Sequence, residues 1–164
     1  MAKLPGWTRF WDAAEHGAYP SPMDPATLSA ELCVRLQHTD AAGVIFYPRL
    51  LELEEELFER WLEAGGLQLR DMLVTRTLAP TPVVRCEADY RLPVRVGDRL
   101  TARLVLVEAG QSAFTLGWRF ERAGAVAMEA RVVRAAIDPA AGRSVELPPA
   151  LRAWIDASRA TANR

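Results

Sequence analysis

Residues 38–50, HTDAAGVIFYPRL, contain a carboxylate, a glycine and a proline at spacings that would suit a catalytic site. Asp40 lies three residues before Gly43 and eight before Pro48. Proline is favoured in the first turn of a helix, where the N–H that it lacks would have no intrahelical partner. The neighbouring N–H groups can stabilise an oxyanion, while a nearby carboxylate can attack a carbonyl or activate water. Asp is also common in turns, where it binds its own backbone, and composition alone favours that simpler role.

The residues after Pro48 predict one long helix, which must position this segment. Its apolar residues recur at spacings of three and four and form one stripe, consisting of Leu50, Leu53, Leu57, Phe58, Trp61 and Leu62. The helix is expected to end near Ala64, because Gly65 and Gly66 follow it. Glu54 falls on the apolar stripe, a local conflict of the kind that collects at functional or interface positions.

Strand patterns surround this helix. Residues 32–37 alternate before it, and four further strands are expected after it, at 82–92, 99–108, 112–122 and 125–137. The gaps between the last three strands are so short that they predict an antiparallel meander. A shorter second helix is expected within 67–76, and a final helix after Pro149. This order predicts an α+β fold, in which an antiparallel sheet wraps around one long central helix.

Composition excludes several classes of function. The chain has 164 residues, half of them apolar, and a net charge of −1 without a basic block, so we expect no nucleic-acid partner. The sequence shows no apolar run of membrane-spanning length and no signal peptide, so we expect no membrane partner and a cytoplasmic location. Two strand cysteines, Cys33 and Cys86, and two distant histidines form no recognisable metal-ligand set.

Residues 1–28 differ from the rest of the chain. They carry four prolines and a dense group of large aromatic residues, Trp7, Phe10 and Trp11. Aromatic side chains of this density are expected to dock onto a surface rather than to stay in water. We therefore expect an N-terminal extension over 1–28 and a single domain over 29–164.

Two motifs, in this order, resemble the hotdog-fold acyl-CoA thioesterases of the 4-hydroxybenzoyl-CoA thioesterase family. The first is TDAAGVIFYPRL at 39–50, in which Asp40, a glycine and an aromatic precede the helix. The second is TPVVRCEADYRLPVRVGDRL at 81–100, which ends on a Gly-Asp-x-Leu element entering a strand. The likeness covers roughly 32–147, and the two motifs together are fairly specific. The Tyr-Pro pair is similar to that of the branch acting on aromatic acyl-CoA.

The resemblance implies roles for individual residues. Asp40 corresponds to the catalytic carboxylate, as nucleophile or general base, and the N–H of Tyr47 to the donor that polarises the thioester carbonyl. Glu55 corresponds to an acidic position of the family, and a role in assisting catalysis from the helix is expected for it as much as a place on a solvated helix face or in a subunit salt bridge. The residues expected to bind substrate are Gly43, Phe46, Pro48, Glu55, Arg91 and Arg119. The two arginines are candidates for the CoA phosphates, with Arg131 and Arg134 as further candidates.

The implied function is hydrolysis of an acyl-CoA whose acyl group is aromatic, of hydroxybenzoyl or dihydroxynaphthoyl type. No metal or redox cofactor is expected, and coenzyme A enters only as part of the substrate. The alternatives are an acyl-carrier-protein thioesterase, a hotdog dehydratase, or a module that binds acyl-CoA without turning it over. A dehydratase would use a histidine with a carboxylate, but the Tyr47-Pro48 helix start argues against it. His38 is expected either to face solvent or to lie at the rim of the site.

A sheet wrapped around one helix leaves an exposed edge. Pairing across such an edge is a natural route to a dimer. We therefore expect a homodimer or a homotetramer built from two dimers, with the sites at the subunit interface.

Overall fold

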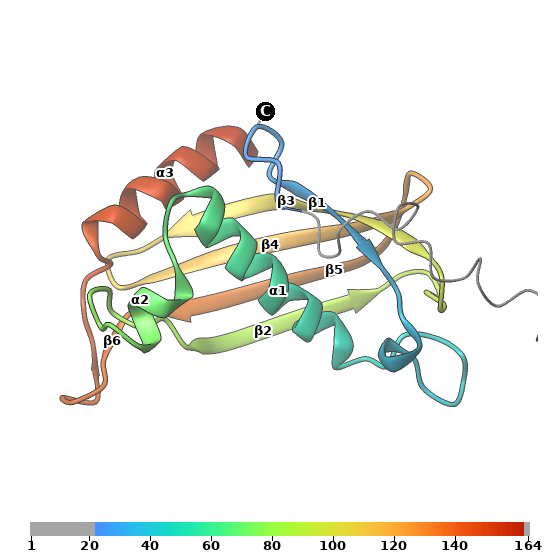
Figure 1. Ribbon diagram of the computed structural model, residues 1–164, viewed down its shortest axis with the longest axis horizontal. Coiled ribbons are helices and arrows are strands. Elements are labelled where there is room, and N and C mark those ends of the chain that lie inside the picture. The colour runs from blue at the N-terminus through green and yellow to red at the C-terminus, as the bar shows by residue number, and fades with distance from the viewer. Residues whose placement is uncertain (1–21, 163–164) are drawn as a thin grey trace, which may run out of the picture.

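The computed structural model describes residues 22–162 and contains one five-stranded antiparallel sheet with a long helix across one face (Figure 1). The strands lie in the order β1-β3-β4-β5-β2. Their bounds are Ser29–Cys33 for β1, Val83–Tyr90 for β2, Arg99–Ala109 for β3, Ala113–Arg122 for β4 and Ala125–Ala135 for β5. Because β3, β4 and β5 pair in sequence order, the predicted meander is confirmed. The predicted α+β architecture is confirmed as well.

The long helix α1 spans Arg49–Ala64, and its predicted apolar stripe is buried against the sheet. It ends at Gly65, and the following Gly66 has φ +72°, a left-handed conformation that glycine adopts without a steric cost. Four of the remaining elements are short: the 3-10 helix η2 (Leu36–His38), the helix α2 (Leu69–Leu73) and the strands β6 (Ile137–Asp138) and β7 (Arg143–Ser144). The final helix α3 spans Pro149–Ala162.

Aromatic packing fixes the C-terminal half of α1. Trp61 is fully buried, and its ring stacks with those of Phe58 and Phe114. Its Nε1 donates a hydrogen bond of 2.8 Å to Ser158 Oγ of α3, and Trp154 Nε1 donates one of 2.7 Å to the Trp61 carbonyl. Large aromatic rings with satisfied polar tips bury much apolar area. This half of the helix is thereby anchored, and its N-terminal end is held over one edge of the sheet.

Strand β2 is the least covered part of the sheet. It pairs with β5 on one side only, and every one of its residues is exposed in the single chain. Cys86 and Ala88 lie opposite Val132 and Ala130, which are buried, so they share the face of the sheet on which α1 lies. The helix therefore leaves a strip of the sheet uncovered along β2.

Two local expectations are wrong. The strand expected over 32–37 ends at Cys33, and Leu36 turns outward in η2 with 78% of its surface exposed. His38, expected to face solvent or to lie at the rim of the site, is buried at 6% exposure. Both errors have one cause, because His38 Nδ1 accepts a hydrogen bond of 3.0 Å from the Arg35 N–H and folds the chain into a turn. The last strand also stops two residues early, at Ala135.

The expected N-terminal extension lies mostly outside the described residues, which begin at position 22. Residues 22–28 precede β1 and contribute Met23 and Leu28 to the hydrophobic core. The body described here is therefore packed from residue 23 onward.

Candidate active site

The segment that carries Asp40 is a closed loop leading into α1. The Phe46 N–H donates to the His38 carbonyl at 2.8 Å, and the Asp40 N–H donates to the Val44 carbonyl at 3.0 Å. Gly43 sits at the tip with φ +73°, so the glycine serves a left-handed turn. These bonds bring the two ends of the loop together, so Asp40 and the start of the helix belong to one compact unit.

The Asp40 carboxylate takes part in this turn and is exposed to solvent. Its Oδ1 accepts a hydrogen bond of 2.8 Å from the Ala42 N–H, the local bond expected of a turn aspartate. A carboxylate can accept several hydrogen bonds, so this single one leaves lone pairs for a water or a substrate carbonyl carbon. Within residues 22–162 no cation pairs with Asp40. Asp40 therefore stabilises the turn, and its carboxylate can still act in catalysis.

His38 is buried and holds the loop through two hydrogen bonds. Burial lowers the pKa of this histidine, the nearby Arg49 and Arg35 act in the same direction, and Glu56 and Glu52 oppose it. Because Nδ1 accepts from the Arg35 N–H, the neutral ring carries its proton on Nε2. Its carbonyl also accepts the Phe46 N–H, so the residue holds both the turn before Asp40 and the mouth of the loop.

The start of α1 leaves two backbone N–H groups unpaired among the described residues, those of Tyr47 and Leu50. The Arg49 N–H donates to the Phe46 carbonyl at 2.8 Å, and Pro48 has no N–H. The Tyr47 N–H, in contrast, makes no hydrogen bond with any part of the chain that the structure describes. Unpaired N–H groups at a helix start carry the positive end of the helix dipole. Tyr47 therefore presents a donor suited to a carbonyl oxygen that gains negative charge.

A cleft of about 400 Å³ opens beside this donor. We call it the Tyr47 cleft; it is lined by Val44, Ile45, Tyr47, Tyr90, Arg91, Leu92, Pro93 and Val94. The Tyr90 hydroxyl, at the end of β2, donates a hydrogen bond to the Tyr47 carbonyl, and the Ile45 N–H donates to the Val94 carbonyl at 2.7 Å. Phe46 packs edge-on against the Tyr47 ring, with centroids 5.2 Å apart. Asp40 does not line this cleft in the single chain.

A second cleft of about 260 Å³ lies farther along the same helix. We call it the Glu54 cleft; it is lined by Leu51, Glu52, Glu54, Glu55, Val83, Cys86 and Val132. The helix α1 runs away from Tyr90 while β2 runs toward it, so the two elements are antiparallel (Figure 1). The two clefts therefore lie one after the other along α1 and β2 and share no lining residue, and we refer to the pair as the trough.

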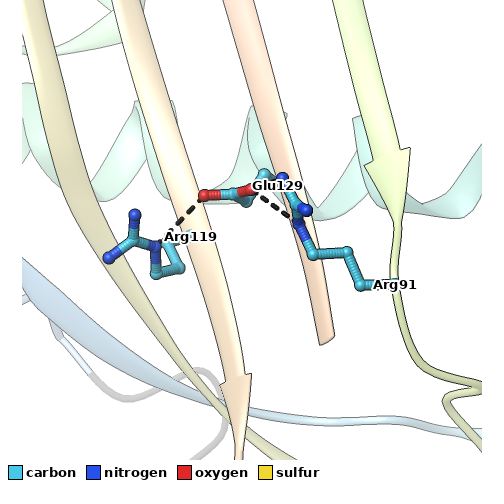
Figure 2. A network of polar contacts seen from close by, with 3 residues as sticks. All are labelled: Arg91, Arg119 and Glu129. Carbon is cyan, nitrogen blue, oxygen red and sulfur yellow. Dashed lines mark hydrogen bonds and ion pairs between the residues drawn. The ribbon is translucent and has the colours of Figure 1, made fainter. Parts of the chain in front are cut away.

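The candidate phosphate ligands Arg91 and Arg119 meet at one carboxylate. Arg91 Nε donates to Glu129 Oε2 at 2.8 Å, and Arg119 Nε donates to Glu129 Oε1 at 3.2 Å, as Figure 2 shows. The hydrogen bond from Arg91 is the main reason that the pKa of Glu129 is lowered. The cluster keeps one net positive charge, and Arg91 also lines the Tyr47 cleft. Arg119 lies farther from that cleft, on β4.

Glu55 and the other two candidate arginines are placed differently. Arg134 is buried at 3% exposure and donates to Glu54 at 3.1 Å and to Glu55 at 2.7 Å, so it is not available to a phosphate in solvent. Arg131 pairs with Glu108 at 2.8 Å. Glu55 is half exposed at the rim of the Glu54 cleft.

Sequence reasoning missed two features of this site. Tyr90 was noticed only as part of a motif, yet it ties β2 to the start of α1. The partner of Glu54 was also missed, although the burial of Glu54 on an apolar stripe implied that a cation must lie opposite. That cation comes from a position about 80 residues away in sequence, on β5.

Two further classes of site find no support. Residues 22–162 contain no group of His, Cys, Asp and Glu side chains suited to a metal ion. In the same range, none of the helices has the length and apolar character that crossing a membrane requires.

Comparison with known proteins gives consistent matches. The model of the thioesterase-like superfamily matches residues 34–155. A 1,4-dihydroxy-2-naphthoyl-CoA hydrolase of Prochlorococcus marinus is 34% identical over 137 residues, covering 80% of this chain and 88% of that protein. The crystal structure of a 1,4-dihydroxy-2-naphthoyl-CoA thioesterase from Synechocystis aligns with a TM-score of 0.74 at 25% identity, covering 79% of this chain and 96% of the other.

A 4-hydroxybenzoyl-CoA thioesterase crystallised with 4-hydroxybenzoyl-CoA aligns with a TM-score of 0.66. It covers 79% of this chain and 96% of its own, at 21% identity. At this identity the likeness concerns the fold alone, and it is the fold expected from the two sequence motifs.

Proposed function

The chain belongs to the thioesterase-like superfamily and has its hotdog fold, and on that premise we propose that it hydrolyses an aromatic acyl-CoA, with 1,4-dihydroxy-2-naphthoyl-CoA as the first substrate to test. The products are the free aromatic acid and coenzyme A. The observation that carries the proposal is the unpaired Tyr47 N–H at the start of α1, beside an apolar cleft and directly after the loop that holds Asp40.

In the proposed reaction the thioester carbonyl oxygen accepts a hydrogen bond from the Tyr47 N–H. This donor, with the helix dipole behind it, stabilises the negative charge that develops on the oxygen when the carbonyl carbon is attacked. Asp40 acts either as the nucleophile, which forms a mixed anhydride that water then hydrolyses, or as the general base that takes a proton from the attacking water. In both cases the C–S bond breaks and coenzyme A leaves as the thiol.

The remaining candidate residues have supporting roles in this proposal. Gly43 gives the loop its turn, while Pro48 removes a competing donor and Phe46 packs against the Tyr47 ring at the entrance to the cleft. Arg91, which lines the Tyr47 cleft, and Arg119, which shares Glu129 with it, supply positive charge for the CoA phosphates. Glu55 lies at the rim of the acyl-group end of the trough. No metal or redox cofactor takes part, and coenzyme A is present only in the substrate.

The proposed assembly is a homodimer, or a homotetramer of two dimers, that pairs through β2. This strand has a free edge and two uncovered faces, and Val83, Val84 and Tyr90 expose apolar surface on it. A bare strand edge of this kind pairs readily with another strand. Asp40 does not line the Tyr47 cleft of its own chain. In the proposed dimer the second copy therefore contributes residues that complete the site at the interface. We place the enzyme in the cytoplasm, a reducing compartment that suits its two free cysteines.

The test is release of free thiol from a panel of acyl-CoA thioesters. The panel contains 1,4-dihydroxy-2-naphthoyl-, 4-hydroxybenzoyl-, benzoyl-, hexanoyl- and palmitoyl-CoA, and the variant is Asp40→Asn. We expect turnover selective for aromatic substrates, and a loss in the variant on the order of 100-fold or more in kcat, because the amide can neither attack nor take a proton.

Asp24→Asn is a matched control for that variant. The Asp24 Oδ1 accepts a hydrogen bond of 2.8 Å from the Ala26 N–H, the same local bond at the same distance as in the Asp40 turn. Because Asn keeps the Oδ1 acceptor of each turn, we expect Asp24→Asn to retain activity and only Asp40→Asn to lose it. Full activity of Asp40→Asn would overturn the assignment of the carboxylate, and acyl-CoA binding without any turnover would favour a binding module.

A further inference from the structure

A buried polar cluster lies beneath the N-terminal half of α1. Glu54 is 1% exposed, and its Oε2 accepts a hydrogen bond of 3.1 Å from Arg134 Nη2 of β5. The Arg134 guanidinium also lies over the Phe58 ring, 3.7 Å from its centroid. Trp118 of β4 is close enough to lower the pKa of Glu54, although its indole N–H makes no hydrogen bond of ordinary geometry. Polar groups this deeply buried are normally fully paired.

Three atoms of this cluster have no partner among the described residues. They are Glu54 Oε1, Arg134 Nε and Trp118 Nε1. The first accepts hydrogen bonds and the other two donate them. A hydroxyl group can donate its hydrogen to Glu54 Oε1, and Glu54 is the residue of this cluster that lines a cleft. Leaving Oε1 unpaired in the interior is unfavourable, which gives such a hydroxyl a reason to bind.

The cluster is aligned with the proposed catalytic donor. Glu54 is seven residues, or two helical turns, beyond Tyr47, and Leu51 lies between them at a spacing of four, so all three follow one side of the helix. Two turns correspond to a distance of roughly 10 Å along the axis. Leu51 and Glu54 line the Glu54 cleft, where Val83, Cys86 and Val132 provide its opposite wall. A flat apolar group whose carbonyl meets Tyr47 would thus extend toward Glu54.

We propose that Glu54 is a specificity-determining residue, whose carboxyl group, held in place by Arg134, binds a hydroxyl group on the aromatic acyl ring. The proposal rests on the proposed function and refines its substrate class to hydroxylated aromatic acyl groups. The unpaired atoms are covered in the single chain, and Glu54 alone of the three residues lines the cleft. In the proposal the Glu54 carboxyl group accepts a hydrogen bond from the ring hydroxyl at the wall of this cleft.

The experiment compares kcat/KM for two substrates that differ only in hydroxyl groups, 1,4-dihydroxy-2-naphthoyl-CoA and 2-naphthoyl-CoA. We expect the wild type to prefer the hydroxylated substrate by about tenfold or more, since a hydrogen bond to a charged group contributes at this level. Replacement of the buried pair by apolar residues, in the double variant Glu54→Leu with Arg134→Met, should reduce the preference to about threefold or less. Intrinsic reactivity of the two thioesters cancels, because the readout is the change in their ratio.

Two further variants keep the result interpretable. Glu54→Gln retains the size of the side chain and should lower the preference even if the double variant folds poorly. Glu59→Gln removes one negative charge from an exposed position of the same helix and should leave the preference at the wild-type value. General damage to the fold lowers kcat/KM for both substrates and leaves their ratio unchanged.

Binding of the free acids separates this inference from the proposed function. Calorimetry with 1,4-dihydroxy-2-naphthoate and 2-naphthoate should show the same preference in the wild type and its loss in the double variant. Absence of thiol release, with this binding preference intact, would overturn the proposed function and leave the inference standing. A preference for hydroxylated ligands that persists in both Glu54 variants would overturn the inference, and a buried water would then be the occupant of the cluster.

Discussion

The Tyr90 hydroxyl donates a hydrogen bond to the Tyr47 carbonyl, so the end of the edge strand is tied to a residue that carries a free backbone donor. The two residues are 43 positions apart in sequence and form opposite sides of the Tyr47 cleft. Burial raises the pKa of Tyr90, which keeps the phenol protonated as a donor near neutral pH. The bond therefore holds the Tyr47 backbone in one position relative to the sheet.

Removal of this hydroxyl tests whether the tie matters for catalysis. Tyr90→Phe should lower kcat by about 3- to 10-fold, the loss expected when one ordinary hydrogen bond that orients a catalytic group disappears. Steady-state thiol-release kinetics give kcat, and a thermal melt shows whether the fold is retained. An unchanged kcat in a folded variant would mean that Tyr47 is oriented by the helix alone.

The pH dependence of stability should report the burial of His38. Its pKa is lowered in the folded chain, mainly by burial, so below about pH 6.5 the unfolded chain binds a proton that the folded chain resists. Stability is therefore expected to fall as the pH decreases through that value. In His38→Asn the side-chain oxygen can still accept the Arg35 N–H and does not titrate.

Thermal midpoints measured from pH 8 to pH 5 compare the two proteins. We expect the midpoint of the wild type to decrease more steeply than that of His38→Asn below pH 6.5. Parallel profiles would show that His38 does not change its proton affinity on folding. The comparison with the variant is needed because groups other than His38 also contribute to the pH dependence of stability.

Glu54 should give a pH dependence of the opposite sign. Burial raises its pKa to about 7, more than the attraction of Arg134 and the contact with Trp118 lower it, and Glu55 adds repulsion. Between pH 4.5, its ordinary pKa, and pH 7 the folded chain holds a proton that the unfolded chain releases, so this carboxyl group costs stability as the pH rises through that window. The shift corresponds to at most about 3 kcal/mol at pH 8.

The variant Glu54→Gln removes that titration. Relative to the wild type, it should gain free energy of unfolding between pH 5 and pH 8, as urea denaturation at each pH would measure. The sign is the essential point, because a glutamate held mainly by its ion pair would give the reverse trend. A difference between the two proteins that stays constant with pH would place the pKa of Glu54 near its ordinary value.

The sequence predicted the long elements because periodicity over ten or more residues reports which face is buried. The stripe of α1 and the stop at Gly65 follow from local rules, and Glu54 stood out because it violates them. The turn at Leu36 was not predictable in the same way. It depends on one side chain, His38, that accepts a bond from a backbone N–H three residues earlier, a contact with no periodic signature.

The candidate site likewise has one part that the sequence predicts and one part that it does not. The loop and the helix start that carry Asp40 and Tyr47 are neighbours in sequence, so one motif contains both. Tyr90 and Arg134 reach the site from strands 43 and 80 residues away from their partners, because the sheet brings distant segments beside α1. Contacts of that range arise from strand register, which a single sequence does not specify.

The free edge of β2 gives a final prediction about assembly. Val84 exposes 59% of its surface on this strand, at a register irregularity between Val83 and Arg85. A lysine on a strand edge opposes pairing with another copy, because two like charges would be brought together and partly desolvated. Val84→Lys should therefore shift the chain from dimer to monomer in light scattering. If the second copy completes the site, kcat/KM of this variant should also be lower than that of the wild type, and it should decrease further as the protein is diluted.

Leu36→Lys is the matched control, since Leu36 is an apolar residue with 78% exposure outside any strand. A dimer that survives Val84→Lys as well as Leu36→Lys would show that the copies meet through another surface.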